Sequence, residues 1–325
     1  MLDVDDLHVE FRTRQGVARA INGVSFSLDQ GETLAILGES GSGKSVTAQA
    51  IMGIIDTPPG YITGGRVLYC GDDLLPLPEK VRRTVRGSHI SMIFQDALSA
   101  LNPVFPVGWQ VAEMMREHWG WNKSDSLARA VELMERVRIP GAKERVHAYP
   151  HQFSGGMRQR IMIAMAIALD PVVLIADEPT TALDVTVQAQ IMELLKELQA
   201  ESNMGLILIT HDLGVVAEVA DRVAVMYTGR IVESGGIHDI FAAPGHAYTR
   251  GLLDSIPRLD QKGNKLSAIG GLPPNLLHIP PGCSFNPRCR FRGAECSTGQ
   301  APELIEIRPG RHSSCLRAEE VLADV

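Results

Sequence analysis

The chain has 325 residues, enough for a sizeable core and two or three domains. Its 31 Lys and Arg against 38 Asp and Glu give a formal net charge of −7, and no long basic tract is present, so the charge pattern of a nucleic-acid-binding protein is missing. The acidic N-terminus shows no signal peptide, and the longest apolar run, Ile161 to Leu169, is about half of a membrane span. We therefore expect a soluble, cytoplasmic protein that reaches a membrane only through partner proteins.

The first 55 residues predict strands, then a loop and a helix. Leu7 to Gln30 indicates short strands with a turn near Gln15-Gly16, and every second residue of Val24 to Leu28 is apolar, as a half-buried strand requires. Thr33 to Leu37 is an apolar run typical of a buried strand. The stretch Val46 to Ile55 is compatible with a helix.

Between that strand and that helix, Gly38 to Ser45 read GESGSGKS, which fits G-x-x-x-x-G-K-[ST] at every fixed position. Glycines let such a loop wrap its N–H groups round a phosphate, and the helix N-terminus adds partial positive charge. Lys44 is expected to reach the β- and γ-phosphates, and Ser45 to ligate Mg²⁺. The residues that we expect to bind the nucleotide here are Gly38, Ser40, Gly41, Ser42, Gly43, Lys44, Ser45 and Val46.

The chain then alternates strands and helices. Asp56 to Gly60 and Gly64-Gly65 predict a loop, followed by a strand over Arg66 to Tyr69. Residues 96–146 are rich in helix formers and predict a helical insertion. Helical spacing of apolar residues predicts a helix over 187–198, with Asp184 or Thr186 as its N-cap. Further strands are expected at His89 to Phe94, Val172 to Ala176, Leu206 to Ile209, and in a hairpin of Val223 to Val225 with Arg230 to Ser234.

The strand at 172–176 runs directly into two carboxylates, Asp177 and Glu178. Ligand sites of parallel sheets lie at such strand ends. Asp177 is suited to hold Mg²⁺ through water, and Glu178 to polarise an attacking water as general base.

Ser154-Gly155-Gly156 follows the helical insertion and resembles the signature motif of the ATP-binding cassette (ABC) ATPases. Most members read LSGGQ, whereas this chain has Phe153 and Met157 at the flanks, as in the peptide-uptake branch. A helix that begins near Gly156 directs N–H groups and its dipole at an anion. In the family, that anion is the γ-phosphate of ATP on a partner subunit.

Other landmarks of that family follow in order. Gln95 matches the glutamine that senses Mg²⁺ and the γ-phosphate, and His211 matches the switch histidine. Thr181-Ala182-Leu183-Asp184 resembles the loop that crosses the dimer interface, so the resemblance implies that Asp184 lies near the nucleotide. Phe11 occupies the place of an aromatic that stacks on adenine.

The resemblance covers essentially the whole chain and is to the oligopeptide and dipeptide uptake ATPases. It implies an α/β fold, an ABC-type phosphate-loop nucleotide-binding domain with an antiparallel β subdomain, a helical subdomain and a small C-terminal domain. We place the boundaries at 1–95 and 166–240 for the two parts of the ATP-binding core, 96–165 for the helical subdomain, and 241–325 for the C-terminal domain.

The resemblance also implies an activity and partners. The chain would hydrolyse ATP at the cytoplasmic face of the inner membrane as a peripheral subunit. Its partners would be a second ATPase subunit, either a copy or a paralogue, two membrane permeases and an extracytoplasmic solute-binding protein. The solute stays open among dipeptides, oligopeptides, glutathione and nickel.

Two rival functions remain. One is a soluble ABC ATPase of translation or DNA repair, which usually carries two cassettes or basic insertions. The other is an exporter subunit, against which the tail argues. We also expect the segment from Gln95 into the insertion to receive permease helices through Phe105, Val107 and Trp109, unless these side chains pack the insertion's own core.

Four of the five cysteines lie in the tail, at Cys283, Cys289, Cys296 and Cys315, with five, six and eighteen residues between them. A disulfide framework is not expected in the cytosol, and the tight C-x₂₋₄-C pair of structural zinc is missing. Four thiolates fit a [4Fe–4S] cluster, whose negative charge the arginines of the tail would offset. Zinc and the absence of any metal stay open as alternatives.

Overall fold

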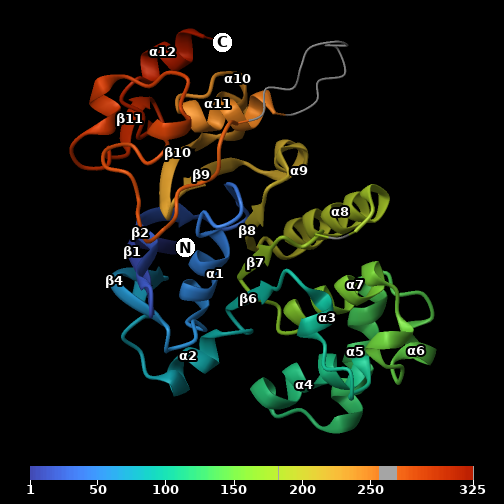
Figure 1. Ribbon diagram of the computed structural model, residues 1–325. Helices are drawn as coiled ribbons and strands as arrows, with labels where there is room; N and C mark the ends of the chain where they lie inside the picture. Colours follow the sequence, from blue (N-terminus) through green and yellow to red (C-terminus); the bar gives the residue numbers. More distant parts are fainter. Residues whose placement is uncertain (182, 256–268, 325) are drawn as a thin grey trace. The chain divides into compact units, whose positions relative to one another are not determined.

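The computed structural model of the chain describes residues 1–181, 183–255 and 269–324 (Figure 1). The chain divides into two compact units, which we describe one at a time. Unit 1 consists of Met1–Ser27, Thr33–Asp73 and Thr210–Val325, and unit 2 of Leu28–Glu32 and Leu74–Ile209.

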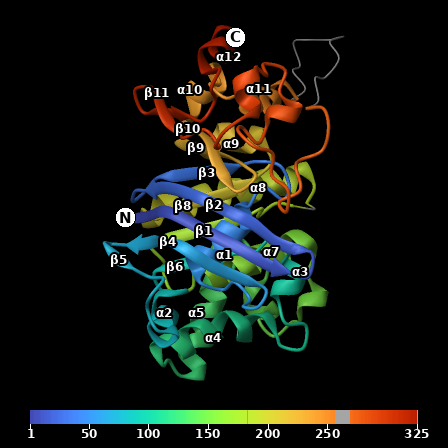
Figure 2. The same ribbon diagram turned by 60° about the vertical axis from the view of Figure 1, so that its left-hand side comes forward.

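Unit 1 contains two sheets and the helices beside them (Figures 1 and 2). Its strands are β1 (Leu2–Thr13), β2 (Gly16–Leu28), β3 (Thr33–Leu37), β4 (Gly60–Tyr69), β5 (Asp72–Asp73), β9 (Arg222–Tyr227), β10 (Arg230–Gly236), β11 (Ile305–Arg308) and β12 (Arg311–Ser313). Its helices are α1 (Lys44–Met52), α9 (Leu213–Val219), α10 (Ile237–Ala242), α11 (Ala247–Asp254) and α12 (Ala318–Ala323), with 3₁₀ turns at Asn286–Arg288 and Ala294–Ser297.

The first sheet of unit 1 has the strand order β2-β1-β4-β5, and β1 pairs with β4 in antiparallel fashion. The predicted loop at Gly64-Gly65 is wrong, because β4 starts at Gly60 and runs through both glycines. Gly65 has φ +91°, and a Cβ there would lie 2.5 Å from the carbonyl oxygen of Asp6. The register of the two strands shifts at this point, so the glycines allow an irregular strand to pass close to its neighbour.

The second sheet of unit 1 has the strand order β11-β12-β10-β9-β3. All five residues of β3 are buried, and β3 pairs with β9 in parallel. The predicted hairpin is confirmed as β9 and β10, whose two turn residues, Thr228 and Gly229, both have positive φ as a type I′ turn requires.

Apolar residues of the C-terminal tail complete the core of unit 1. Tyr248 and Phe285 are fully or almost fully buried, and their rings lie 4.6 Å and 5.4 Å from that of Tyr227 on β9. Leu37 of β3 and Val321 of α12 belong to the same cluster. The tail therefore folds against the strand that precedes the phosphate loop and does not build a core of its own.

Unit 2 contains three parallel strands in the order β8-β7-β6 and a group of helices (Figures 1 and 2). The strands are β6 (Ile90–Ile93), β7 (Val173–Asp177) and β8 (Gly205–Thr210, of which Thr210 belongs to unit 1). The helices are α2 (Glu79–Val85), α3 (Ala97–Ala100), α4 (Val107–Trp119), α5 (Lys123–Arg136), α6 (Ala142–Arg145), α7 (Gly155–Ala166) and α8 (Val185–Ser202), with a 3₁₀ turn at Pro150–Gln152. Within the described residues of both units, we find no helix whose length and apolar character would let it span a membrane.

Candidate functional site

The phosphate loop of unit 1 joins β3 to α1, as predicted. Gly38 lies against the main chain of β9, where a Cβ would collide with the carbonyl oxygen of Met226. Gly43 has φ +108°, and a Cβ there would lie 2.7 Å from the carbonyl oxygen of Ala20. Only glycine fits at these two positions, so neighbouring backbone from distant parts of the sequence fixes the shape of the loop.

The Lys44 side chain is buried inside the loop. Its Nζ donates to the carbonyl oxygens of Gly38, at 2.7 Å, and Glu39, at 3.1 Å. Ser42 is also buried, and its Oγ has no hydrogen-bond partner among the residues that the structure describes. Gly43 is the N-cap of α1 and offers no side chain to accept from the first turn. These features fit an anion that would receive donors from the loop and the helix start.

The remaining predicted loop residues lie at its surface. Ser40 and Gly41 are exposed, and Ser45 and Val46, in the first turn of α1, are half-buried. A loop with an open tip and a buried base is able to admit a phosphate from outside.

Three further residues, Gly229, Tyr248 and Arg288, form hydrogen bonds with the phosphate loop. The sequence did not mark them as loop contacts. The N–H of Gly229 donates to the carbonyl oxygen of Ser42 at 2.8 Å. The N–H of Glu39 donates to the hydroxyl of Tyr248 at 2.8 Å. The Arg288 guanidinium donates to both carboxylate oxygens of Glu39, at 2.6 Å and 2.9 Å. Glu39 fills a position that the motif leaves free, so no sequence signal marked these contacts.

Two other predicted site residues, Phe11 and His211, also belong to unit 1. Phe11 lies on β1, half-buried, opposite Gly60 of β4, and a Cβ on that glycine would come 3.0 Å from its ring. His211 is exposed and follows β8 directly, at the end of the strand as expected.

In unit 2, the predicted carboxylates lie at the end of β7. Asp177 is buried and is the last residue of the strand. Glu178 has φ +46°, a backbone conformation that is uncommon for residues other than glycine. Its N–H donates to the carbonyl oxygen of Ile209 on β8 at 2.8 Å. Its Oε2 accepts from Nε2 of Gln95 at 2.9 Å and from the Thr181 hydroxyl at 2.8 Å. The structure thus brings together Gln95 and Glu178, which are 83 positions apart in the sequence.

The predicted signature segment forms a helix start. Ser154 is the N-cap of α7, and its Oγ accepts from the N–H of Met157 at 3.4 Å. Gly155 is exposed, whereas a Cβ on Gly156 would lie 2.7 Å from Val187 of α8. The glycine at 156 therefore lets two helices of unit 2 approach closely.

Asp184 is the N-cap of α8. It is one of the two residues, Asp184 and Thr186, that the sequence predicted for this position. Its Oδ1 accepts from the N–H of Val187 at 2.9 Å. The side chain is exposed at the start of the helix. Ala182, in the same predicted loop, lies outside the described residues.

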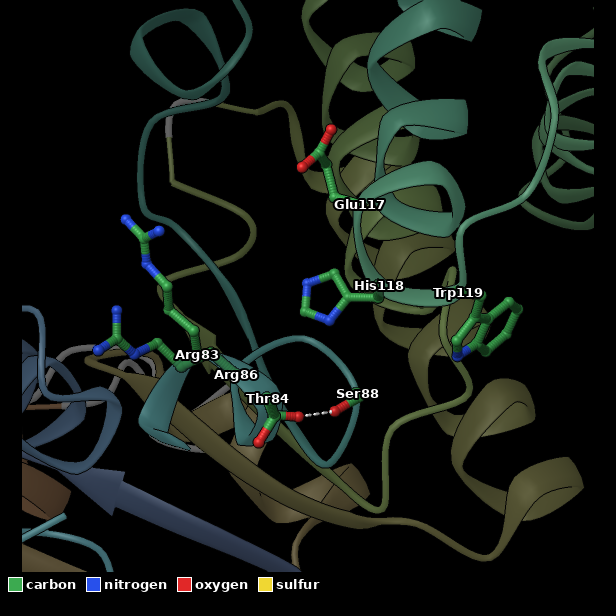
Figure 3. A pocket seen from close by; sticks show the side chains of 7 residues that line it. All are labelled: Arg83, Thr84, Arg86, Ser88, Glu117, His118 and Trp119. Atoms are coloured by element: carbon green, nitrogen blue, oxygen red, sulfur yellow. Dashed lines mark hydrogen bonds between the residues drawn. The ribbon is translucent and has the colours of Figure 1, made fainter. Parts of the chain in front are cut away.

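Unit 2 also has a pocket of about 600 Å³ that contains none of the predicted site residues (Figure 3). Arg83, Thr84, Arg86 and Ser88 line one side, and Glu117, His118 and Trp119 at the end of α4 line the other. Arg86 already pairs with Glu79 at 2.6 Å. The lining of the pocket carries both positive and negative charges and does not indicate one ligand class.

The four tail cysteines gather in unit 1 beside the shared core. The N–H of Cys283 donates to the carbonyl oxygen of Cys296 at 3.0 Å, and Cys283, Cys289 and Cys315 pack against the core cluster. Burial raises the pKa of Cys283 to about 11 and raises the pKa values of Cys289 and Cys315, so neutral thiols are favoured at pH 7.

The expected metal cluster does not appear in the arrangement of these side chains. No group of three or more His, Cys, Asp or Glu side chains in the described ranges is placed to hold a metal ion. The thiols of Cys283, Cys289 and Cys315 pack against the edge of the core, as small apolar side chains do.

The tail arginines also have other partners than the cysteines. Arg288 pairs with Glu39, Arg290 with Asp254 and Asp324, and Arg317 with Glu295 and Glu320. Their charge is therefore balanced mainly by carboxylates.

Comparison with known proteins agrees with this architecture. A family model described as ABC transporter matches residues 21–181, and one described as oligopeptide/dipeptide transporter, C-terminal region, matches residues 232–296. The dimeric ATP-binding cassette MJ0796, solved with ADP and Pi, has a TM-score of 0.66 at 25% identity and covers 73% of this chain and 99% of its own. The cbiO1 protein of Clostridium perfringens has a TM-score of 0.63 at 30% identity and covers 74% of this chain and 90% of its own.

Curated relatives are more similar. The oligopeptide transport ATP-binding protein OppD of Bacillus subtilis is 56% identical over 94% of this chain and 86% of its own length. The dipeptide transport ATP-binding protein DppD of the same organism is 54% identical over 91% and 88%. OppD of Salmonella typhimurium is 50% identical over 99% and 95%. The chain thus belongs to the oligopeptide and dipeptide family of ABC transporter ATP-binding proteins.

Proposed function

We propose that this chain is the ATP-hydrolysing subunit of an ABC importer that takes up dipeptides, oligopeptides or related small solutes. The observation that carries the proposal is the phosphate loop, with its buried Lys44 and its backbone shape fixed by Gly38 and Gly43. The names of the relatives, which are oligopeptide and dipeptide transport proteins, support the solute class. The rival of a soluble ABC ATPase gains no support from them.

We assign the roles as follows. The loop from Gly38 to Val46 would bind the phosphates of ATP, and Phe11 would stack on the adenine. Mg²⁺ neutralises phosphate charge when it is bound, and Ser45, Gln95 and Asp177 are the side chains we assign to it.

Glu178 would act as the general base. Its Oε2 accepts from Gln95 and from Thr181, and these bonds orient the carboxylate. We assign His211 to the γ-phosphate as the switch residue. Ser154, Gly155, Gly156 and Asp184 would serve a second ATPase subunit, because the exposed helix start at Ser154 is available to an outside anion.

The first experiment separates binding from chemistry. Glu178→Gln should retain MgATP binding but lower turnover of the assembled transporter by about 100-fold or more, because the general base is lost. Lys44→Ala should instead weaken MgATP binding itself. Glu193→Gln, on the exposed face of α8, is the matched control and should leave both unchanged. Near-normal turnover of Glu178→Gln would remove the assignment.

The partners are the second part of the proposal: two permeases, a solute-binding protein and a second ATPase subunit, a copy or a paralogue, on the cytoplasmic face of the membrane. Val107 is fully buried and packs within unit 2, whereas Phe105 is 39% exposed and stacks on Trp109 at 4.4 Å. The neighbouring Val104 is 69% exposed. We therefore propose 104–109 as a permease contact, without Val107.

Co-purification with permeases tests this part. Val104→Cys should crosslink to permease loops in the full complex, and Val17→Cys, an exposed valine of unit 1, should not. Failure of the chain to co-purify with any membrane protein would favour the soluble ATPase instead.

The [4Fe–4S] cluster on Cys283, Cys289, Cys296 and Cys315 remains a proposal. Its support is that the N–H of Cys283 donates to the carbonyl oxygen of Cys296 at 3.0 Å, and that Cys283, Cys289 and Cys315 pack against one core cluster of unit 1. Zinc and no metal are the alternatives. Anaerobically purified protein should be brown and contain about four irons per chain, and Cys289→Ser should bleach it while Cys70→Ser should not. Stoichiometric zinc would change the metal, and neither metal would leave ordinary thiols.

A further inference from the structure

The side chain of Arg288, from the cysteine-bearing tail, meets the phosphate loop in unit 1. It is 5% exposed and donates to both oxygens of the Glu39 carboxylate, which is 26% exposed. Its Nε donates to the carbonyl oxygen of Gly270 at 3.0 Å, and one terminal nitrogen lies 3.3 Å from the hydroxyl of Tyr227. A guanidinium held at three points on the protein is a fixed partner for the loop.

Glu39 in turn touches the group that binds phosphate. Its carbonyl oxygen accepts from Nζ of Lys44 at 3.1 Å, and its N–H donates to Tyr248 at 2.8 Å. The side chain, N–H and carbonyl of one residue are therefore tied to Arg288, Tyr248 and Lys44. A rotation of Glu39 would move the carbonyl that receives the lysine.

The charge of Glu39 makes this contact necessary. A carboxylate in a loop that receives a polyphosphate repels the ligand unless a cation balances it. Arg288 supplies that cation with two parallel hydrogen bonds. A guanidinium is protonated at any physiological pH, so this cation persists. A lysine would supply a charge but not both bonds.

We propose that Arg288 is a positioning residue for nucleotide binding, through which the tail balances the charge of Glu39 and so keeps the phosphate loop in its binding shape. This rests on the proposed function in one respect, namely that the loop binds ATP. It adds a task for the tail segment between Cys283 and Cys289 that is independent of any metal.

The test is a double-mutant cycle of Arg288→Ala, Glu39→Gln and the double variant in the full-length chain, with MgATP affinity measured by titration calorimetry. Arg288→Ala should weaken MgATP binding about tenfold, within the range that close charge pairs show in such cycles. Glu39→Gln in the Arg288→Ala background should recover most of that loss, because the uncompensated carboxylate is removed. Arg288→Lys should fall between wild type and Arg288→Ala.

Arg290→Ala is the matched control. Arg290 lies two positions away, is 49% exposed, and pairs with Asp254 and Asp324 instead of the loop. Its removal should leave MgATP affinity unchanged. In the assembled transporter, Arg288→Ala should raise the KM for ATP and leave kcat at saturating ATP close to wild type, a split that general loss of folded protein does not produce.

Two results would overturn the inference. Unchanged affinity of a folded Arg288→Ala variant would show that the loop does not depend on Arg288. An equal loss in the single variant and in Arg288→Ala with Glu39→Gln would show a structural role without the charge effect. If Arg288→Ala does not fold, Arg288→Lys carries the same comparison. Lys44→Ala serves as the reference that does not bind MgATP. Wild-type protein whose titration does not differ from that of Lys44→Ala would instead remove the proposed function.

Discussion

Two glycine-rich helix starts, that of α1 in unit 1 and that of α7 in unit 2, are held in different ways. The α1 start lies in a loop whose Ser42, Gly43 and Lys44 are buried, and residues from far along the chain support it. The α7 start is exposed at Ser154 and Gly155, and its side-chain cap comes from Ser154 itself.

The difference fits the two kinds of anion site that we propose. A loop with tertiary support is pre-organised by its own chain, which lowers the cost of ordering it on binding. An exposed helix start gains a ligand only when another surface brings one. This agrees with the proposal that the first site binds ATP and the second serves the ATP of a second subunit.

The largest expected effect comes from a charge placed on the exposed start. Gly155→Asp should fold normally, since a Cβ there meets only Leu183 at 3.6 Å and a carboxylate favours a helix N-terminus. It should nevertheless lower ATP turnover of the assembled transporter about 100-fold, as loss of phosphate-stabilising donors does elsewhere. Ser124→Asp, which adds a carboxylate to the first turn of α5, is the control. Normal turnover of Gly155→Asp would break the comparison.

A third helix start, that of α11, has a buried cap and should respond to pH. His246 accepts from the N–H of Tyr248 through Nδ1 at 3.1 Å, and burial lowers the pKa of His246 to about 3. An unfolded histidine titrates near pH ~6.5, so the unfolded chain binds the proton first and stability falls as pH drops from about 6.5 toward 3.

His246→Asn keeps an N-cap acceptor and removes this titration. The pH dependence of the free energy of unfolding should therefore become shallower by up to about 1.4 kcal/mol per pH unit below pH ~6. Buried Glu233, whose pKa is raised by burial, acts in the opposite sense but is present in both proteins. Equal slopes from denaturant unfolding at pH 5 to 7 would show that His246 does not titrate on unfolding.

The smallest effect compares two capping side chains within unit 2. Asp184→Ala removes a 2.9 Å bond to Val187 and should lower the free energy of unfolding by about 1 kcal/mol. Ser154→Ala removes a 3.4 Å bond to Met157 and should cost about 0.5 kcal/mol. Urea unfolding of both variants measures the difference, and a larger cost for Ser154→Ala would contradict the view that its start is loosely held.

The sequence predicted the elements whose signals are local. Apolar runs identified β3 and β7, because strands buried on both faces need apolar residues throughout. The motif located the loop before α1, and Asp184 was among the two predicted caps, because capping depends on residues three positions apart. The order of motifs indicated the family.

The tertiary structure decided what depends on distant partners. Gly64-Gly65 reads as a loop, yet both residues lie within β4, and at Gly65 the neighbouring strand approaches too closely for a side chain. Gln95 and Glu178 meet because β6 and β7 are adjacent parallel strands. Glu39 and Arg288 are 249 positions apart, and in the sequence neither can be told from an ordinary charged residue of the surface. Periodicity records whether a residue is buried, but the partner of a charge is set by which segments pack together, and so only the fold of unit 1 placed the tail against the phosphate loop.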